Sequence, residues 1–224
     1  MKEHIGKIFA GLAIILVGAS FVYANFVSNQ ANEGIVFTEN VKGNPDAVVS
    51  LVKYSDFQCG ACAQFYPSVN AILADYGDQI RFEYKHFPLV SIHQNAIPAA
   101  KAAEAAGQQG EFFAMHDLIF ENQSVWANSA NPISFFNQYA QEIGLDVEEF
   151  KTQYRASLIE DRIQESFNEA RELGLSGTPT FFLNGEQMEI ESFQDFRSQI
   201  ETALGVIGDE AGQVADDKEA EISI

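Results

Sequence analysis

The two cysteines of the chain, Cys59 and Cys62, stand three residues apart just after an apolar run, and this feature constrains the fold most. Residues 47–54 are apolar and rich in β-branched side chains, which is typical of a buried strand. From Cys62 onward, apolar residues recur at spacings of three, four and seven, which predicts an amphipathic helix beginning near Cys59. One cysteine therefore starts a helix and the other lies on its buried face. The apolar face comprises Cys62, Phe65, Val69, Ile72, Leu73 and Tyr76.

Further strands and helices surround this unit. In residues 81–86, charged side chains alternate with aromatic or histidine side chains, which predicts a second strand. Strand, helix and strand then form a parallel βαβ unit. Residues 91–174 show helical periods without a clear strand and predict an all-helical insertion. Residues 180–183 return to strand character, and Asn184-Gly185 is a hairpin signal. We place Met188 and Ile190 on the returning strand and a last helix after Ser192, which can cap it.

The N-terminus and the C-terminus differ from the rest in composition. Residues 8–27 carry no charge and follow Lys2 and Lys7, and a helix of that length would cross a hydrocarbon core of about 30 Å. The positive-inside rule then leaves the remainder outside the cytoplasm. Cleavage after the sequence Val22-Tyr23-Ala24 is the alternative. Residues 208–224 hold six acidic residues and one lysine and predict a disordered tail.

The net charge disfavours one class of partner. With 32 acidic and 13 basic residues the formal charge is −19, which repels phosphate backbones. We therefore expect no nucleic-acid partner.

The spacing of the cysteines favours chemistry over structural cross-linking. A disulfide between Cys59 and Cys62 closes almost no loop, so it would add little stability. Cys59 lies where helix N–H groups are unsatisfied and the helix dipole favours a thiolate, which makes it the attacking nucleophile. Cys62 is placed to resolve the mixed disulfide. Because Gly60 and Ala61 supply no charge, we expect a moderately depressed pKa for Cys59.

Other uses of the cysteines stay open on these residues alone. A pair at this spacing is half of a zinc site, which His86 and His93 could complete, and a copper site is a similar alternative. The cysteines could also be inert core residues.

Several segments resemble DsbA-like thioredoxin-fold thiol–disulfide oxidoreductases across residues 35–205. These are Asp56-Phe57-Gln58-Cys59-Gly60-Ala61-Cys62, Pro67, His86-Phe87-Pro88-Leu89 and Gly177-Thr178-Pro179-Thr180-Phe181-Phe182-Leu183-Asn184-Gly185. The resemblance implies that Phe57, Gly60 and Ala61 belong to the active-site loop. It also implies that Pro179 is cis and faces the dithiol, and that the Thr178 backbone pairs with an extended substrate.

Two departures from the family pattern concern the site. Members of this family commonly carry a buried acid six residues before the first cysteine, where this chain has Lys53. Glu83 or Lys85 on the neighbouring strand would pair with it, so these three residues are candidates for a proton relay. Gly60-Ala61 also replaces the Pro-His pair of strongly oxidising members.

The resemblance thus predicts an α/β thioredoxin fold with an all-helical insertion, and the uncharged run at residues 8–27 predicts an N-terminal hydrophobic helix before it. We expect a protein disulfide oxidoreductase that needs no cofactor beyond its redox-active disulfide and works in the periplasm or at the outer face of the cell membrane. Its partners would be reduced or misoxidised exported proteins and a membrane redox partner that resets the dithiol. A reductase or isomerase on the same fold, a metal-binding module and a redox-inactive adaptor are the alternatives. The predicted segments are a signal-anchor or signal peptide (1–27), a linker (28–44), a thioredoxin-like core (45–90 and 175–207), the helical insertion (91–174) and the acidic tail (208–224).

Overall fold

A central sheet carries the βαβ unit that the sequence predicts. The computed structural model describes residues 19–20 and 30–206. Within that part of the chain the strands lie in the order β1-β3-β2-β4-β5. β2 and β3 are parallel and joined by helix α2, whereas the other neighbouring pairs are antiparallel. The strands are β1 (Val41–Gly43), β2 (Val49–Ser55), β3 (Ile80–His86), β4 (Thr180–Leu183) and β5 (Glu186–Gln187).

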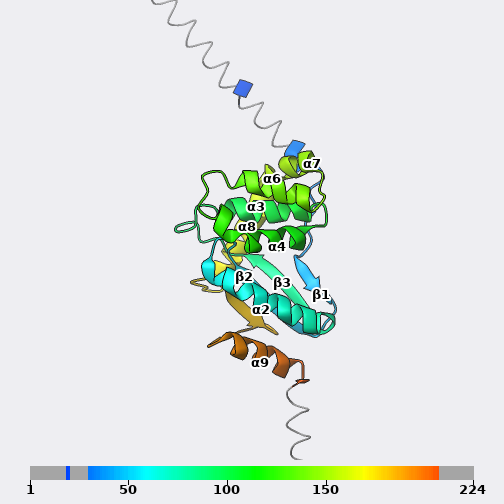
Figure 1. The fold of residues 1–224 in the computed structure, drawn as a ribbon, viewed down its shortest axis with the longest axis vertical. Coiled ribbons are helices and arrows are strands. Elements are labelled where there is room, and N and C mark those ends of the chain that lie inside the picture. Colours follow the sequence, from blue (N-terminus) through cyan, green and yellow to red (C-terminus); the bar gives the residue numbers. More distant parts are fainter. Residues whose placement is uncertain (1–18, 21–29, 207–224) are drawn as a thin grey trace, which may run out of the picture.

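Helices cover both faces of this sheet and one of its ends. Figure 1 shows α2 lying across the strands, α9 beyond the lower edge, and the helices of the insertion gathered at the upper end. The short turn η1 (Gly77–Gln79) joins α2 to β3. The helices are α2 (Gly60–Tyr76), α3 (Ala96–Gly107), α4 (Phe112–Glu121), α5 (Gln123–Trp126), α6 (Ile133–Glu142), α7 (Val147–Tyr154), α8 (Ser157–Glu172) and α9 (Phe193–Ala203).

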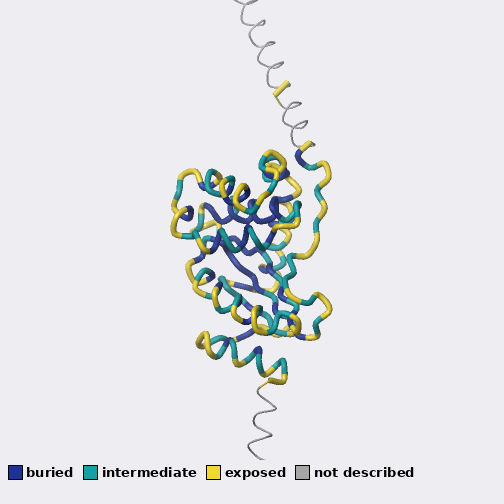
Figure 2. The backbone as a smooth tube through the Cα atoms, turned by 45° about the vertical axis from the view of Figure 1, so that its right-hand side comes forward, coloured by how far each residue is buried: buried dark blue, intermediate teal, exposed yellow. Residues whose placement is uncertain are grey.

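The alternation of β2 divides its side chains between two apolar clusters. Leu51 packs with Cys62 and Phe82 in the main core, on the face that α2 covers. Tyr54 packs on the opposite face with Ala170 of α8. The sheet is therefore buried on both sides, and Figure 2 shows the buried backbone concentrated where the sheet meets the helical insertion.

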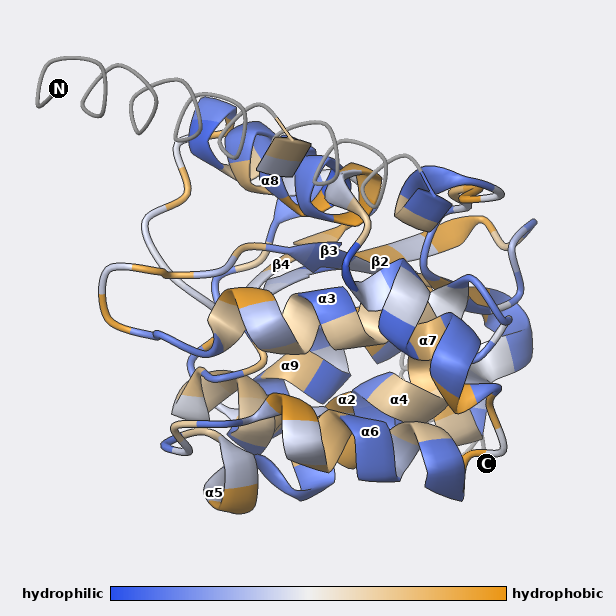
Figure 3. Cartoon of the chain, turned by 90° about the horizontal axis from the view of Figure 1, so that it is seen from above, coloured by the Kyte–Doolittle hydropathy of each residue, from blue (hydrophilic) through white to orange (hydrophobic). Residues whose placement is uncertain are grey.

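The helix ends follow the expected capping chemistry. Asp146 accepts hydrogen bonds from the N–H groups of Glu148 and Glu149 at the start of α7, and Ser192 accepts from Asp195 N–H at the start of α9. In Figure 3, hydrophobic and hydrophilic residues share the surfaces of α6 and α7, as expected for helices with one buried face.

Some sequence-based expectations need correction. Residues 41–43, assigned to the linker, form the edge strand β1 and pair with β3. Their run is too short to be distinguished from a loop by its pattern. Met188 and Ile190 lie beyond β5, which ends at Gln187, although Asn184 and Gly185 form the expected turn with φ of 52° and 87°.

The predicted terminal segments fall largely outside the described residues. Apart from residues 19 and 20, this is true of the predicted hydrophobic helix in segment 1–27, and it is true of the predicted acidic tail at 208–224. Among the described residues, no helix combines the length and hydropathy needed to cross a membrane.

Candidate active site

Cys59 occupies the N-cap position of α2. Its backbone is extended (φ −71°, ψ 122°), and the helix begins with the next residue, Gly60. The Cys62 thiol donates a hydrogen bond to the Cys59 sulfur, and this is the largest cause that lowers the pKa of Cys59 to about 5. Burial opposes the shift, while Thr178 and the backbone N–H groups of Cys62 and Ala61 reinforce it. The site therefore holds Cys59 as a thiolate at neutral pH.

Cys62 has the opposite environment. It is completely buried, whereas Cys59 keeps an exposed fraction of 7%. Burial is the main cause that raises the pKa of Cys62, and its hydrogen bond to Cys59 raises it further. The two sulfurs are thus unequal: that of Cys59 is the less deeply buried and is ionised, whereas that of Cys62 is completely buried and protonated.

The loop before β4 faces this sulfur. The Thr178–Pro179 peptide bond is cis, as the family resemblance implies. The Cys59 sulfur lies 3.3 Å from the Thr178 carbonyl oxygen, to which the thiol form can donate. In the thiolate form that bond is lost. The Thr178 side chain helps to lower the pKa of Cys59, and its buried hydroxyl has no other hydrogen-bond partner among the described residues.

The loop before Cys59 is held by a buried carboxylate. Asp56 Oδ1 accepts a hydrogen bond from Gln58 N–H at 2.7 Å, and its Oδ2 accepts one from Leu89 N–H at 2.8 Å and lies 2.7 Å from His93 Nδ1. Phe57 is buried and stacks on Tyr84, with ring centroids 5.0 Å apart. This loop therefore has few ways to rearrange when the sulfur reacts.

The two residues between the cysteines, unlike the buried loop before Cys59, face the solvent. Gly60 and Ala61 are exposed, so the surface that a substrate meets there is small and uncharged.

Three amide side chains fasten the helical insertion to the active-site loop, and sequence reasoning missed them. Gln123 donates to the carbonyl oxygens of Phe57 (2.7 Å) and Cys59 (3.0 Å). Gln58 donates to the Ala127 carbonyl at 2.7 Å and accepts from Asn95 N–H at 2.7 Å. The buried Asn95 side chain donates to carbonyls of residues 126, 127 and 129. Isolated amides in polar segments carry no periodic signal, so the sequence alone could not single them out.

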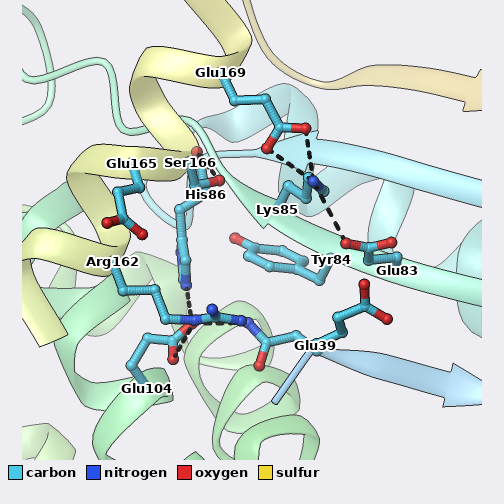
Figure 4. Close-up of a pocket in the computed structure, with 11 residues that line it drawn as sticks. Glu39, Glu83, Tyr84, Lys85, His86, Glu104, Arg162, Glu165, Ser166 and Glu169 are labelled. Carbon is cyan, nitrogen blue, oxygen red and sulfur yellow. Dashed lines mark hydrogen bonds and ion pairs between the residues drawn. The ribbon is translucent and has the colours of Figure 1, made fainter. Parts of the chain in front are cut away.

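Lys53 lies behind the dithiol, but Glu83 and Lys85 do not, so the expected pairing with Lys53 is wrong. Lys53 is opposite Tyr84 on β3, whereas Glu83 is opposite Val52. Because successive strand residues point to opposite faces, Glu83 and Lys85 project away from the cysteines. Figure 4 shows them beneath α8, where Lys85 Nζ lies 2.7 Å from Glu169 and 3.6 Å from Glu83.

The histidines considered for a metal site have other partners. His86 Nε2 lies 2.8 Å from Glu104, and His93 contacts Asp56. Figure 4 shows the His86 ring directed at Glu104. In the part of the chain that the structure describes, no three His, Cys, Asp or Glu side chains are arranged to hold a metal ion.

Comparison with known proteins identifies the family of this chain. The profile of the family described as Thioredoxin matches residues 36–202. The chain belongs to the thioredoxin family. Within this family, the chain carries a cysteine at a helix N-cap, a buried second cysteine three residues later and a cis-proline loop.

Solved structures of thioredoxin-family proteins show the same fold. A thioredoxin-like oxidoreductase from Silicibacter pomeroyi is 26% identical, with a TM-score of 0.62 over 74% of this chain and 91% of that one. The thiol–disulfide exchange protein alpha-DsbA2 from Wolbachia pipientis is 20% identical, with a TM-score of 0.65 over 83% and 98%. BdbD from Bacillus subtilis is 19% identical, with a TM-score of 0.65 over 73% and 91%. The thioredoxin fold that the resemblance to DsbA-like proteins implies is confirmed.

The curated relatives of this thioredoxin-family chain are much longer proteins. It is 31% identical over 198 residues to Na(+)/H(+) antiporter NhaA 1 of Mycobacterium sp. (strain KMS), covering 83% of this chain and 31% of the antiporter. It is 37% identical over 149 residues to Na(+)/H(+) antiporter NhaA 3 of Salinispora tropica, covering 66% and 22%. The chain thus spans less than a third of these relatives.

Proposed function

We propose that the protein introduces disulfides into exported proteins by exchange at Cys59 and Cys62. The observation that carries this proposal is the stabilised thiolate of Cys59, whose pKa is lowered to about 5. Each unit by which the pKa of Cys59 lies below the ambient pH stabilises the reduced protein by about 1.4 kcal/mol. For a two-electron couple this raises the reduction potential by about 30 mV. A stabilised reduced state makes the disulfide form an oxidant.

The electrons pass between the two cysteine sulfurs and the substrate thiols. A substrate thiolate attacks the Cys59 sulfur, the Cys59–Cys62 bond breaks, and its electron pair stays on Cys62. A second substrate thiolate attacks the substrate sulfur of the mixed disulfide and expels Cys59 as a thiolate. Two electrons have then passed to the dithiol, and the substrate holds a new disulfide. The edge that Thr178 and Pro179 present beside Cys59 would hold the substrate backbone during both attacks.

The location and the partners follow from this chemistry. A dithiol oxidase works where disulfides persist, outside the cytoplasm, and it needs a partner that removes the two electrons after each turnover. We propose a membrane partner, either anchored beside this protein or reached after export. The likeness to part of proteins named as antiporters supports a place next to a membrane protein.

The oxidised protein is mixed with an equimolar amount of a reduced, unfolded secreted protein that holds one disulfide in its native form. We expect loss of substrate thiols at the rate at which the Cys59–Cys62 disulfide disappears, and no loss with Cys59→Ser. A purified wild-type protein that leaves the substrate reduced would overturn the proposal.

The redox state in the source cell gives a second test, read after acid quenching. A mostly disulfide form supports the oxidase, whereas a mostly dithiol form would instead support the reductase or isomerase.

A further inference from the structure

Lys53 is a charged side chain in the middle of the core. It lies on β2, has an exposed fraction of 1%, and is paired across the sheet with Tyr84 on one side and Phe181 on the other. The alternation of β2 directs it to the same face as Leu51, which packs with Cys62 of α2. A cation at such a position is costly unless its surroundings compensate, so its presence needs an explanation.

Aromatic rings rather than carboxylates surround the ammonium group. Its nitrogen lies 4.8 Å from the ring centroid of Phe120 and 5.9 Å from that of Phe181. None of the ion pairs found among the described residues includes Lys53. Ring faces attract a cation, but they do not neutralise its charge. The anion that balances this charge must therefore come from another kind of group.

Four titratable side chains face Lys53, and two of them stay neutral. Burial lowers the pKa of His116 on α4 to about 4 and raises the pKa of Tyr84 on β3. Asp117, beside His116, lies 3.3 Å from Lys42 and is paired there. The remaining two groups are the thiols of α2, Cys59 and Cys62, both of which interact with Lys53 through their charge.

The coupling between Lys53 and the thiols runs in both directions. Burial lowers the pKa of Lys53 to about 8, while Cys62 and then Cys59 raise it. Burial raises the pKa of Cys62, and Lys53 lowers it. A proton on Lys53 and a negative charge on Cys62 therefore favour each other, and by linkage the effect is equal for both partners.

The cluster also contains buried polar atoms that can carry a proton. The hydroxyls of Ser55 and Tyr84 and the Nε2 atom of His116 have no hydrogen-bond partner among the described residues. The Tyr84 and His116 rings have centroids 5.0 Å apart, and Tyr84 is the cross-strand neighbour of Lys53. Such groups in a core are normally paired, and their grouping at this place distinguishes it from the apolar core around it.

We infer that the positive charge of Lys53 stabilises the negative charge that reaches Cys62 when the Cys59–Cys62 disulfide opens, and so drives the exchange in the oxidising direction. This inference deepens the proposed function and rests on its dithiol chemistry. As the substrate thiolate bonds to the Cys59 sulfur, the disulfide bond breaks and its electron pair moves to Cys62. The Lys53 ammonium faces this negative charge, and Cys62 then takes up a proton equivalent to the one that the substrate thiol released when it became the attacking thiolate. A carboxylate at this position would instead repel the leaving thiolate.

The direct test compares Lys53→Met with Lys85→Met. Methionine keeps the length and the ring contacts of Lys53 but removes its charge and proton, whereas Lys85 lies on the other face of the sheet. Each protein is equilibrated with a series of glutathione ratios, and the reduced fraction is read by thiol trapping. We expect the equilibrium constant for reduction of Lys53→Met to fall at least about tenfold, which is about 30 mV. Lys85→Met should match the wild type.

A second measurement needs no variant. The Nζ resonance of Lys53 is titrated by NMR in the oxidised and in the reduced wild-type protein. We expect a higher pKa of Lys53 in the reduced protein, where the thiolate charge faces it. Equal pKa values in both states, or a wild-type equilibrium constant in Lys53→Met, would overturn the inference. A wild-type protein that fails to oxidise substrates while Lys53 keeps its coupling would overturn the proposed function alone.

Discussion

The Cys59 sulfur lies 3.3 Å from the carbonyl oxygen of Thr178, although 119 residues separate the two in the chain. One residue caps α2 and the other precedes β4, so the contact exists only when the sheet is assembled. The helical insertion lies between them in sequence, and its Gln123 bonds back to the Cys59 carbonyl. The reactive sulfur is therefore positioned by three parts of the chain at once.

The inequality of the two sulfurs predicts an order of attack. Cys62→Ser should leave the Cys59 thiolate able to form mixed disulfides and unable to resolve them, so substrate adducts should accumulate. Cys59→Ser should form none, because Cys62 is buried and protonated. Non-reducing electrophoresis after mild oxidation reads both variants. Adducts on Cys59→Ser, or none on Cys62→Ser, would show that the order is reversed.

The thiolate also makes the stability of the reduced protein depend on pH. The pKa of Cys59 is about 5 in the folded protein, against about 8.5 for a free cysteine. Because the folded value is depressed, the stabilisation is fully present above about pH 8.5 and is lost as the pH falls towards about 5. In denaturant unfolding, the difference in unfolding free energy between the reduced and oxidised forms should therefore shrink as the pH falls from about 8.5 to about 5.

The matched control for this pH dependence is the Cys59→Ser, Cys62→Ser double variant. It has no thiolate, so its unfolding free energy should follow the pH dependence of the oxidised protein. A reduced wild-type protein that follows the same curve would contradict the assignment.

The amide contacts of the insertion predict a local effect on stability. Gln123→Ala removes two hydrogen bonds to buried carbonyls and should cost about 1–3 kcal/mol of unfolding free energy. Gln164→Ala is the matched control, because the exposed Gln164 side chain of α8 donates to Asn168 on the same helix. Its cost should stay within about 0.5 kcal/mol. Equal losses of unfolding free energy in the two variants would contradict the role of Gln123 in holding the active-site loop.

Much of the fold could be predicted because it depends on local signals. The apolar face of residues 62–76, the turn at Asn184 and the cap at Ser192 each act within a few residues, and the structure bears them out. The strand β1 could not be predicted, since its three residues are held only by pairing with β3.

Some features of the active site could be predicted from the sequence, and others depend on tertiary packing. The helix-start position of Cys59 follows from periodicity, and the cis bond at Pro179 came from the family resemblance. That Glu83 does not meet Lys53 could not be predicted, because the register between β2 and β3, which places Glu83 opposite Val52, is a tertiary property. The neutral His116 beside Lys53 depends on packing of α4 and has no sequence signal.

The most direct test of the account is a titration of the Cys59 thiol in the reduced protein, followed by the ultraviolet absorbance of the thiolate. The rate of alkylation at each pH identifies the sulfur that ionises. We predict a midpoint of about 5 for Cys59 and no alkylation of Cys62 over the same range. A midpoint near the value of about 8.5 for a free cysteine, or equal reactivity of both sulfurs, would contradict the account.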